Sequence, residues 1–234
     1  MTTVFCYSGK ESDPTYIGLA YTDQRRGRLA STFAYSHEYL SLVNAFAIDP
    51  ELPLQAGNWP VSYELPGCFF DSTPDQWGRN LINKRYPGRR LDSLDYLLSA
   101  SDISRQGALR FKIETNDKFQ FPDTKVPKLM SLQELYYASE SIDDPRASKE
   151  AVQYLLEAGS GSLGGARPKA VVDKDGQLFL AKFPHRYDKT DIIAAEYQAL
   201  RKAQTLGMNV PIRKRVAGAC RHCLMLTQIQ IGRS

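Results

Sequence analysis

The stretch from residue 159 to residue 183 reads GSGSLGGARPKAVVDKDGQLFLAKF and joins a glycine-rich loop to two short apolar segments. Glycines let a backbone approach phosphate oxygens closely and direct several N–H groups toward them. Residues 170–172 and 178–183 have the β-branched and aromatic composition of strands. Asp175-Gly176 between them is typical of a hairpin turn. The stretch therefore predicts a candidate phosphate-binding loop followed by a β-hairpin.

Several interpretations of the loop compete. A Walker A motif is excluded, because the chain contains no Gly-Lys-Ser or Gly-Lys-Thr. The spacing of Gly159, Gly161 and Gly164 matches a dinucleotide fingerprint, but that fingerprint follows a strand and opens a helix, whereas here a helix is expected before the loop and a strand after it. A kinase-type loop over ATP and a flexible linker both remain open for the loop alone.

The residues after the loop favour the kinase interpretation. Lys182 interrupts an apolar strand, where an ammonium group loses hydration unless it meets an anion. A helix is expected over residues 191–206, ended by Gly207, and it contains Glu196. Loop, strand, hairpin, strand lysine and helix glutamate follow one another as in a protein-kinase N-lobe, where the lysine holds the ATP phosphates and the glutamate orients it. The alternative is that Lys182 extends to solvent at an edge and Glu196 is solvated.

Upstream, strand-like and helix-like segments alternate. Runs rich in β-branched and aromatic residues predict strands at residues 4–7, 17–21, 29–35 and 107–113. Thr73 is expected to cap a helix with Pro74 at its first position and Asp75 near its positive end. The apolar face of this helix is Trp77, Leu81 and Ile82. Further helices are expected at 91–98, from Ser131 with capping-box spacing, and from Asp144-Pro145 to Gly159.

Composition and length are those of a globular protein. The 234 residues, 42% hydrophobic and 24% charged, suit one large domain or two small ones and exclude disordered, collagen-like and coiled-coil chains. The sequence shows no apolar run long enough for a membrane span and no signal-peptide pattern, and its four cysteines do not make a disulfide scaffold. We therefore expect a cytoplasmic protein with reduced thiols and no membrane partner.

Charge is distributed unevenly along the chain. The net charge is +4, but residues 159–234 carry 13 Lys and Arg against 5 Asp and Glu, and the first 158 residues carry 17 against 21. A basic C-terminal third is consistent with an anionic ligand, either nucleotide phosphates or nucleic acid. A solvated basic face explains the charge equally well.

Five stretches together match a known pattern: DSTPDQWGR (71–79), GALRF (107–111), SLGGARPK (162–169), AKFP (181–184) and LGMNVP (206–211), with Glu196 before the last. With these motifs the chain resembles the HipA family of bacterial serine/threonine kinases, the toxin half of HipA/HipB-type toxin–antitoxin modules, to about Thr227. The resemblance implies ATP and Mg²⁺ as cofactors. It also implies a small helix-turn-helix, HipB-like antitoxin as partner, with DNA contacted only through that antitoxin.

The resemblance also assigns roles to residues. The candidates for binding ATP phosphates are Ser162, Leu163, Gly164, Gly165, Ala166, Lys169 and Lys182, and Glu196 would orient the lysine. The serine that matches Ser162 can be autophosphorylated in the family. A phosphate there would compete with nucleotide for the same amides and cations.

The expected fold class is α+β, in three parts. Residues 1–112 would form a mixed β/α N-terminal subdomain, residues 113–158 a helical connector, and residues 159–234 a kinase-like N-lobe of antiparallel sheet plus helix. Family members continue into a helical C-lobe that carries the catalytic base and the metal ligands. We expect that lobe, and with it every catalytic and metal-binding residue, to be absent from this chain.

Catalysis is therefore expected to be incomplete. After Lys182 the remaining candidates, Asp188, Asp191 and Asn209, lie in no His-Arg-Asp-like or Asp-Phe-Gly-like segment, and helix capping explains the two aspartates. The chain would be a truncated kinase, with the alternatives of a non-catalytic antitoxin-binding or regulatory fragment and of half of a split kinase completed by a second chain.

Two minor signals have ordinary explanations. Cys220 and Cys223 flank His222 with metal-like spacing, but the chain has no second cysteine pair and a hairpin turn is the simpler interpretation. The basic runs 25–28 and 213–215 fit a solvated face better than direct DNA contact, because no DNA-binding motif accompanies them.

Overall fold

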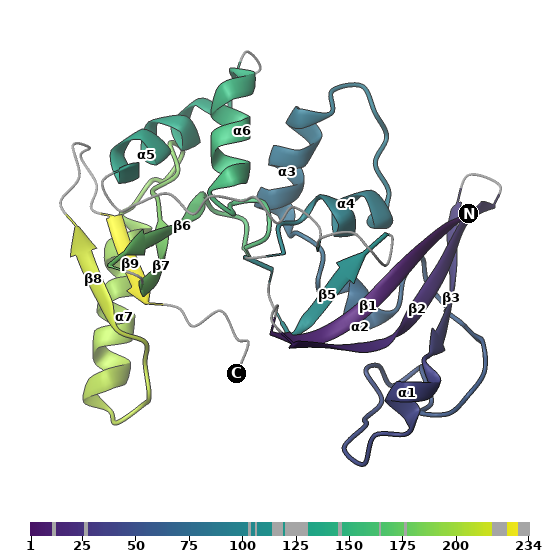
Figure 1. Ribbon diagram of the computed structural model, residues 1–234. Helices are drawn as coiled ribbons and strands as arrows, with labels where there is room; N and C mark the ends of the chain where they lie inside the picture. Colours follow the sequence, from purple (N-terminus) through teal and green to yellow (C-terminus); the bar gives the residue numbers. More distant parts are fainter. Residues whose placement is uncertain are drawn as a thin grey trace. The chain divides into compact units, whose positions relative to one another are not determined.

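The computed structural model describes residues 1–10, 13–25, 28–102, 104–105, 107–113, 119, 131–144, 147–163, 165–175, 177–216 and 224–228. The fold is α+β, as predicted, with two antiparallel sheets. Its contacts divide the chain into two compact units, one formed mainly by residues 1–74 and 88–122 and the other by residues 75–87 and 123–231 (Figure 1).

The first unit is built on a five-stranded sheet in the order β4-β3-β2-β1-β5. Its strands are β1 (Thr2–Lys10), β2 (Asp13–Arg25), β3 (Arg28–Tyr35), β4 (Trp59–Pro60) and β5 (Leu109–Lys112). Along β3 buried and less buried residues alternate, so one face of the sheet is turned to the core. The expected strands at 4–7, 17–21 and 29–35 are confirmed, and the one at 107–113 is shorter than expected.

Three short helices cover the buried face of this sheet: α1 (His37–Leu40), α2 (Gly67–Phe70) and α4 (Ser93–Ser99). The core is rich in aromatic rings. Phe69 on α2 lies with its ring centroid 4.7 Å from that of Phe111 on β5 and 5.9 Å from that of Phe33 on β3. These contacts join the last strand to the middle of the sheet through α2.

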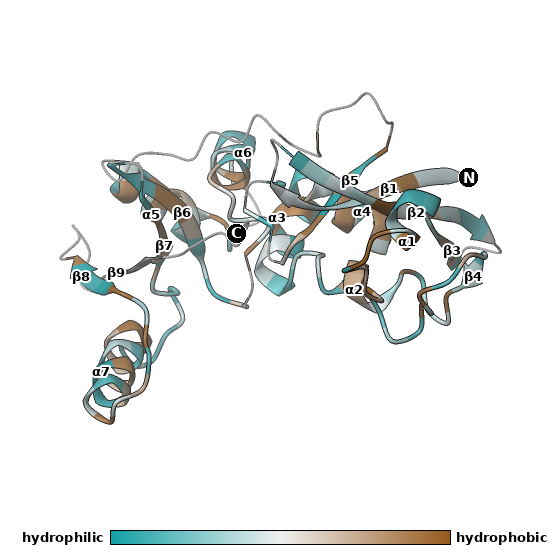
Figure 2. Ribbon diagram, turned by 60° about the horizontal axis from the view of Figure 1, so that its bottom comes forward, coloured by the Kyte–Doolittle hydropathy of each residue, from teal (hydrophilic) through white to brown (hydrophobic). Residues whose placement is uncertain are grey.

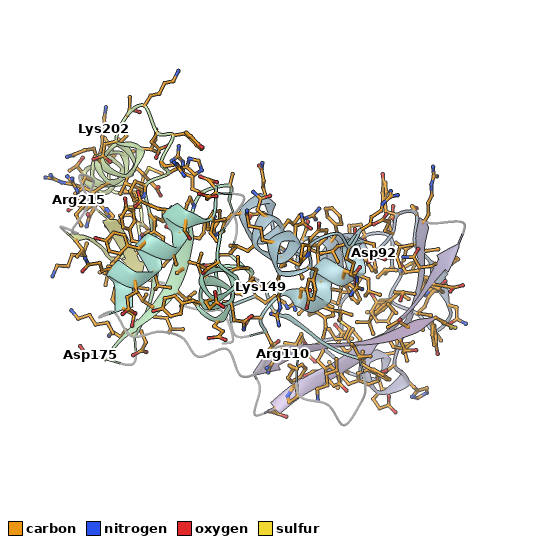
Figure 3. All side chains as sticks on the ribbon, turned by 90° about the horizontal axis from the view of Figure 1, so that it is seen from above. Asp92, Arg110, Lys149, Asp175, Lys202 and Arg215 are labelled. Atoms are coloured by element: carbon orange, nitrogen blue, oxygen red, sulfur yellow. The ribbon has the colours of Figure 1, made fainter. Side chains whose placement is uncertain are left out.

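A buried ion pair ties β5 to the segment that precedes it. The side chains of Arg110 and Asp102 are 1% and 3% exposed, and Arg110 Nε donates to Asp102 Oδ2 at 3.0 Å. The Arg110 guanidinium also lies 3.7 Å from the ring centroid of Phe119 (Figure 3). Arg105, equally buried, donates to the carbonyls of Ser72, Leu97 and Ala100. Two buried arginines thus fix the loop between α4 and β5.

The second unit has a four-stranded sheet in the order β6-β7-β9-β8. Its strands are β6 (Lys169–Lys174), β7 (Gln177–Lys182), β8 (Arg213–Val216) and β9 (Leu224–Gln228), and its helices are α3 (Gln76–Arg85), α5 (Leu132–Ser141), α6 (Lys149–Glu157) and α7 (Ile192–Thr205). Trp77 and Leu81 of α3 belong to the core of this unit, together with Leu155 of α6 and Phe183. Helix α3 therefore packs in a different unit from helices α2 and α4, which flank it in sequence.

Helix starts differ from the sequence predictions. Thr73 does not cap α3; its hydroxyl donates to the Phe70 carbonyl at 2.8 Å, and the N-cap of α3 is Asp75. The helix expected from Asp144 begins later, with Ser148 as N-cap. Ser131 is the N-cap of α5, as predicted, but makes no capping side-chain bond. At the two displaced starts another polar residue close by, Asp75 or Ser148, begins the helix, and sequence spacing alone does not rank such alternatives.

Three short elements were not predicted: α1, α2 and β4. Each has at most four residues, which is too few for hydrophobic periodicity to show. The predicted boundaries at residues 112 and 158 stay predictions, because most of residues 114–130 lie outside the described part of the chain. Among the described residues no helix combines the length and apolar character needed to cross a membrane.

Replacing Asp102 with alanine should lower the free energy of unfolding by about 3–5 kcal/mol, because Arg110 would stay buried without its carboxylate. Urea denaturation followed by circular dichroism measures the change. The double variant Asp102→Ala/Arg110→Met should lose less stability than Asp102→Ala alone. A single variant as stable as the wild type would show that the ion pair does not stabilise the first unit.

Candidate functional site

The glycine-rich loop connects α6 to β6 in the second unit. Helix α6 ends at Glu157, and Gly159 then takes a positive φ of 71°, which confirms the expected stop. The Ser160 amide donates to the Leu155 carbonyl at 3.0 Å, and its hydroxyl donates to the backbone carbonyl of Lys169. The first half of the loop is therefore folded back on the helix and bonded to the start of β6.

The predicted phosphate-loop residues differ in exposure. Ser162 and Leu163 are buried, with exposed fractions of 7% and 5%, whereas Gly165 and Ala166 are exposed. Gly164 lies outside the described residues. The Ser162 amide donates to the Gly159 carbonyl at 3.1 Å, which makes a tight turn of this part of the loop. In this arrangement Ser162 is largely shielded from solvent.

Lys182 and Glu196 form an ion pair between β7 and α7. Their side chains are 28% and 35% exposed, so the pair lies at the edge of the site, partly open to solvent. Helix α7 is placed by Asp191, whose carboxylate accepts from the Ala194 amide at 2.8 Å, and it ends before Gly207 at a φ of 79°. The helix carries hydrophobic and hydrophilic residues side by side (Figure 2).

Lys169 is the more deeply buried of the two lysines. It is directly opposite Lys182 in the register of β6 and β7, is 3% exposed, and its Nζ donates to the Gly165 carbonyl at 2.7 Å. Burial lowers the pKa of Lys169 to about 8, as does the neighbouring positive charge of Lys182, whereas Asp75 and Glu196 act in the opposite direction. Sequence reasoning singled out Lys182 as the desolvated lysine, but the structure gives that property to Lys169.

Asp75 is a site residue that sequence reasoning missed. It was assigned to the positive end of a helix, where the amides of Trp77 and Gly78 act on it, and its charge also favours the protonated form of Lys169. Burial raises the pKa of Asp75, and the charge of Lys169 opposes that rise. No signal in the sequence could link two residues 94 positions apart (75 to 169) on different elements. The structure thus brings two lysines and two carboxylates together beside the loop.

The far end of the loop is fixed by a second ion pair. Arg167 Nη1 donates to Asp188 Oδ1 at 2.6 Å, and the His185 amide donates to Asp188 Oδ2 at 2.9 Å. Burial would raise the pKa of Asp188, but these hydrogen bonds outweigh it and lower the pKa. Asp188 was expected to cap a helix. Instead it anchors the loop, and only Asp191 acts as a cap.

The other sequence candidates do not converge on this site. Within the described part of the chain no three His, Cys, Asp or Glu side chains are grouped as metal ligands, and the segment from Cys220 to Cys223 lies outside it. Arg213 and Arg215 belong to β8, the edge strand, with their guanidinium groups 5.8 Å and 5.7 Å from the ring centroid of Tyr197. Stacking on this ring accounts for both arginines without a nucleic acid.

The lowered pKa of Lys169 predicts how stability depends on pH. Between about pH 8 and pH 10.5 the unfolded chain binds a proton at Lys169 that the folded chain has lost, so stability contributed at this residue rises with pH. The free energy of unfolding of the wild type, minus that of Lys169→Met, should therefore rise by about 2 kcal/mol from pH 7.5 to pH 9.5.

Other groups change the free energy of unfolding with pH in the opposite direction, such as Tyr35, whose pKa burial raises to about 12. Because both proteins contain these groups, subtracting one free energy of unfolding from the other removes their contribution. Lys174→Met, at the exposed end of the same strand, is the matched control for the loss of a lysine side chain. A flat difference for Lys169→Met would contradict the burial of its ammonium group.

Comparison with known proteins bears on the first unit and on α3. Residues 15–112 match the family model of the HipA N-terminal domain. This range contains β2 to β5 together with α1, α2, α3 and α4. No curated protein was found to match the chain. Residues 15–112 are therefore similar to the N-terminal domain of HipA proteins.

Proposed function

We propose that the second unit is the nucleotide-binding lobe of a HipA-type serine/threonine kinase toxin. The observation that carries the proposal is the ion pair of Lys182 and Glu196 between β7 and α7, beside a glycine-rich loop. In kinases a strand lysine paired with a helix glutamate holds the ATP phosphates. The arrangement of an antiparallel sheet, a loop and one helix supports a kinase-like N-lobe.

The residues at the site suit the phosphates of ATP. Lys169 and Lys182 supply two positive charges from adjacent strands, and Gly165, at a φ of 95°, exposes its backbone beside them. The backbone amides of the loop, from Ser162 to Ala166, are the groups that would bind phosphate oxygens. ATP, when bound, supplies the phosphoryl group.

The residues do not suit Mg²⁺. Glu196 is paired with Lys182, Asp188 with Arg167, and Asp75 interacts with Lys169, so these carboxylates are already neutralised by cations. Phosphoryl transfer needs metal ions that neutralise developing charge and a residue that orients the nucleophile. We therefore propose that these 234 residues bind nucleotide without transferring phosphate, and that a C-lobe supplying the metal ligands and the catalytic base would be needed for catalysis.

Ser162 is the proposed site of autophosphorylation. Its buried position in the folded loop means that a phosphate, with about two negative charges, cannot be accommodated without moving the loop. Phosphorylation would then abolish the arrangement that presents Lys169 and Gly165. This physical consequence supports an inactivating role for the modification.

Antitoxin binding by the first unit is the second candidate function. Large apolar side chains are exposed there in one short segment after α1, where Val43 and Phe46 are fully and 62% exposed. Exposed apolar side chains grouped in this way mark protein-binding surfaces. A small helix-turn-helix antitoxin of the HipB type is the proposed partner, and DNA would be reached only through it.

ATP should stabilise the wild-type chain. At a concentration ten times its dissociation constant, ATP raises the free energy of unfolding by about 1.4 kcal/mol, which thermal denaturation detects as a higher Tm. Lys182→Met and Glu196→Gln should each lose most of this shift, because the first removes the cation and the second removes the charge that holds it. Lys174→Met should keep the full shift. Equal shifts in all four proteins would refute the nucleotide site.

The purified chain alone should transfer no phosphate from radiolabelled ATP to itself or to a protein mixture, even with Mg²⁺ present. The reason is that each carboxylate at the site is engaged by a cation. Transfer at an ordinary kinase rate of about 1–100 s⁻¹ would show that the chain is catalytically complete.

A further inference from the structure

We propose, resting on the nucleotide site proposed above, that Asp75 is a positioning residue for Lys169, as Glu196 is for Lys182. The site would then contain two lysine–carboxylate pairs, with each lysine on a strand of one hairpin and each carboxylate on a different helix. Asp75 lies within the range that matches the HipA N-terminal domain, yet it belongs to the second unit. The N-terminal family segment thus contributes directly to the phosphate site.

The position of Gly165 shows how closely these groups approach one another. A Cβ atom on Gly165 would lie 2.7 Å from Lys169 Nζ and 3.9 Å from Asp75 Oδ2. The Lys169 ammonium group and the Asp75 carboxylate therefore both lie close to the position that a Cβ atom at residue 165 would occupy. Any residue larger than glycine there would displace Lys169.

Asp75 differs from the other aspartates that begin helices. Asp92 and Asp191 each accept a hydrogen bond from the amide three residues later, at 2.9 Å and 2.8 Å. Asp75 occupies the same N-cap position of α3 without such a side-chain bond, although the amides of Gly78 and Trp77 act to lower its pKa. Its Oδ1 atom is buried and has no hydrogen-bond partner, so the end of the helix does not use the whole carboxylate.

The charges require such a partner. Lys169 and Lys182 face each other across one strand pair, and like charges in that position repel. Lys182 has Glu196 and is partly solvated, whereas Lys169 is 3% exposed and donates to the neutral carbonyl of Gly165. A buried ammonium group needs a negative charge nearby to stay protonated. Besides Glu196 on α7, the carboxylate that raises the pKa of Lys169 is that of Asp75. Asp75 thus keeps Lys169 charged and in place to receive a phosphate.

The test compares Asp75→Asn with the wild type in two measurements on the full chain. The first follows the titration of Lys169 without nucleotide, by NMR of chains with labelled lysine side chains, the signal being assigned by its loss in Lys169→Arg. The wild-type lysine should titrate near pH 8, and Asp75→Asn should move its midpoint to lower pH, because the variant loses a charge that favours the protonated form.

The second measurement is the dissociation constant of ATP at pH 6.5 and pH 8, by calorimetry. If the midpoint of Lys169 falls to about 7, Asp75→Asn should weaken binding about fivefold at pH 8 and less than about twofold at pH 6.5. In a Lys169→Arg background the same substitution should cost the same factor at both pH values, because arginine stays charged. Asp92→Asn, which removes a capping carboxylate in the first unit, should change neither ATP binding nor the titration.

The outcomes separate this proposal from the nucleotide site itself. If the wild type binds no ATP, the proposed function fails, and the NMR titration still decides whether Asp75 acts on Lys169. An unchanged titration midpoint in Asp75→Asn would refute the pairing. A shifted midpoint with an equal loss of affinity at both pH values would show that Asp75 supports α3 and does not position Lys169 for phosphate.

Discussion

The direct opposition of Lys169 and Lys182 on the β6–β7 hairpin is the constraint on which the second unit depends. Two ammonium groups in a cross-strand pair repel each other, and one of them is almost fully buried. Carboxylates from other elements of the unit offset this repulsion and stabilise the hairpin. Helix α7 brings Glu196, and α3 brings Asp75. The two helices that supply these charges come from segments far apart in the chain, so neutralising the hairpin helps to determine how the unit is assembled.

The loop follows from the same constraint. Residue 165 favours glycine because of its φ of 95°, and a Cβ there would lie 2.7 Å from Lys169 Nζ, which would have to move. At the start of the loop, a Cβ on Gly161 would lie 2.8 Å from a methyl group of Leu156, which would have to move in the same way. Glycines that sequence analysis interpreted as a means to approach phosphate thus also serve packing against α6 and Lys169.

Local features were predictable from the sequence, whereas the partners that complete the site were not. The strands of the first sheet, the β6–β7 hairpin and the extent of α7 follow from residue types within a few positions of one another. Thr73 was misjudged as a helix cap because several polar residues close together can each begin a helix, and Asp75 is the N-cap of α3. Asp188 looked like another cap, but it binds Arg167, 21 residues away. The interaction of Asp75 with Lys169 spans a much greater separation, and it depends on α3 packing in the second unit while its neighbours in sequence pack in the first.

The energetics of the hairpin favour a functional explanation over a structural one. A structural role for Lys169 would be filled better by an apolar residue of similar size, since replacing buried charges with well-packed apolar groups is often neutral or stabilising. The site instead keeps a buried cation whose pKa is lowered to about 8 next to a second cation. Departures from the rules of stable packing concentrate at functional sites, and strongly shifted pKa values do the same. An anion that carries several charges, such as a triphosphate, would attract both lysines and so offset the repulsion between them. Binding such an anion explains why the two lysines lie side by side, which stability alone does not.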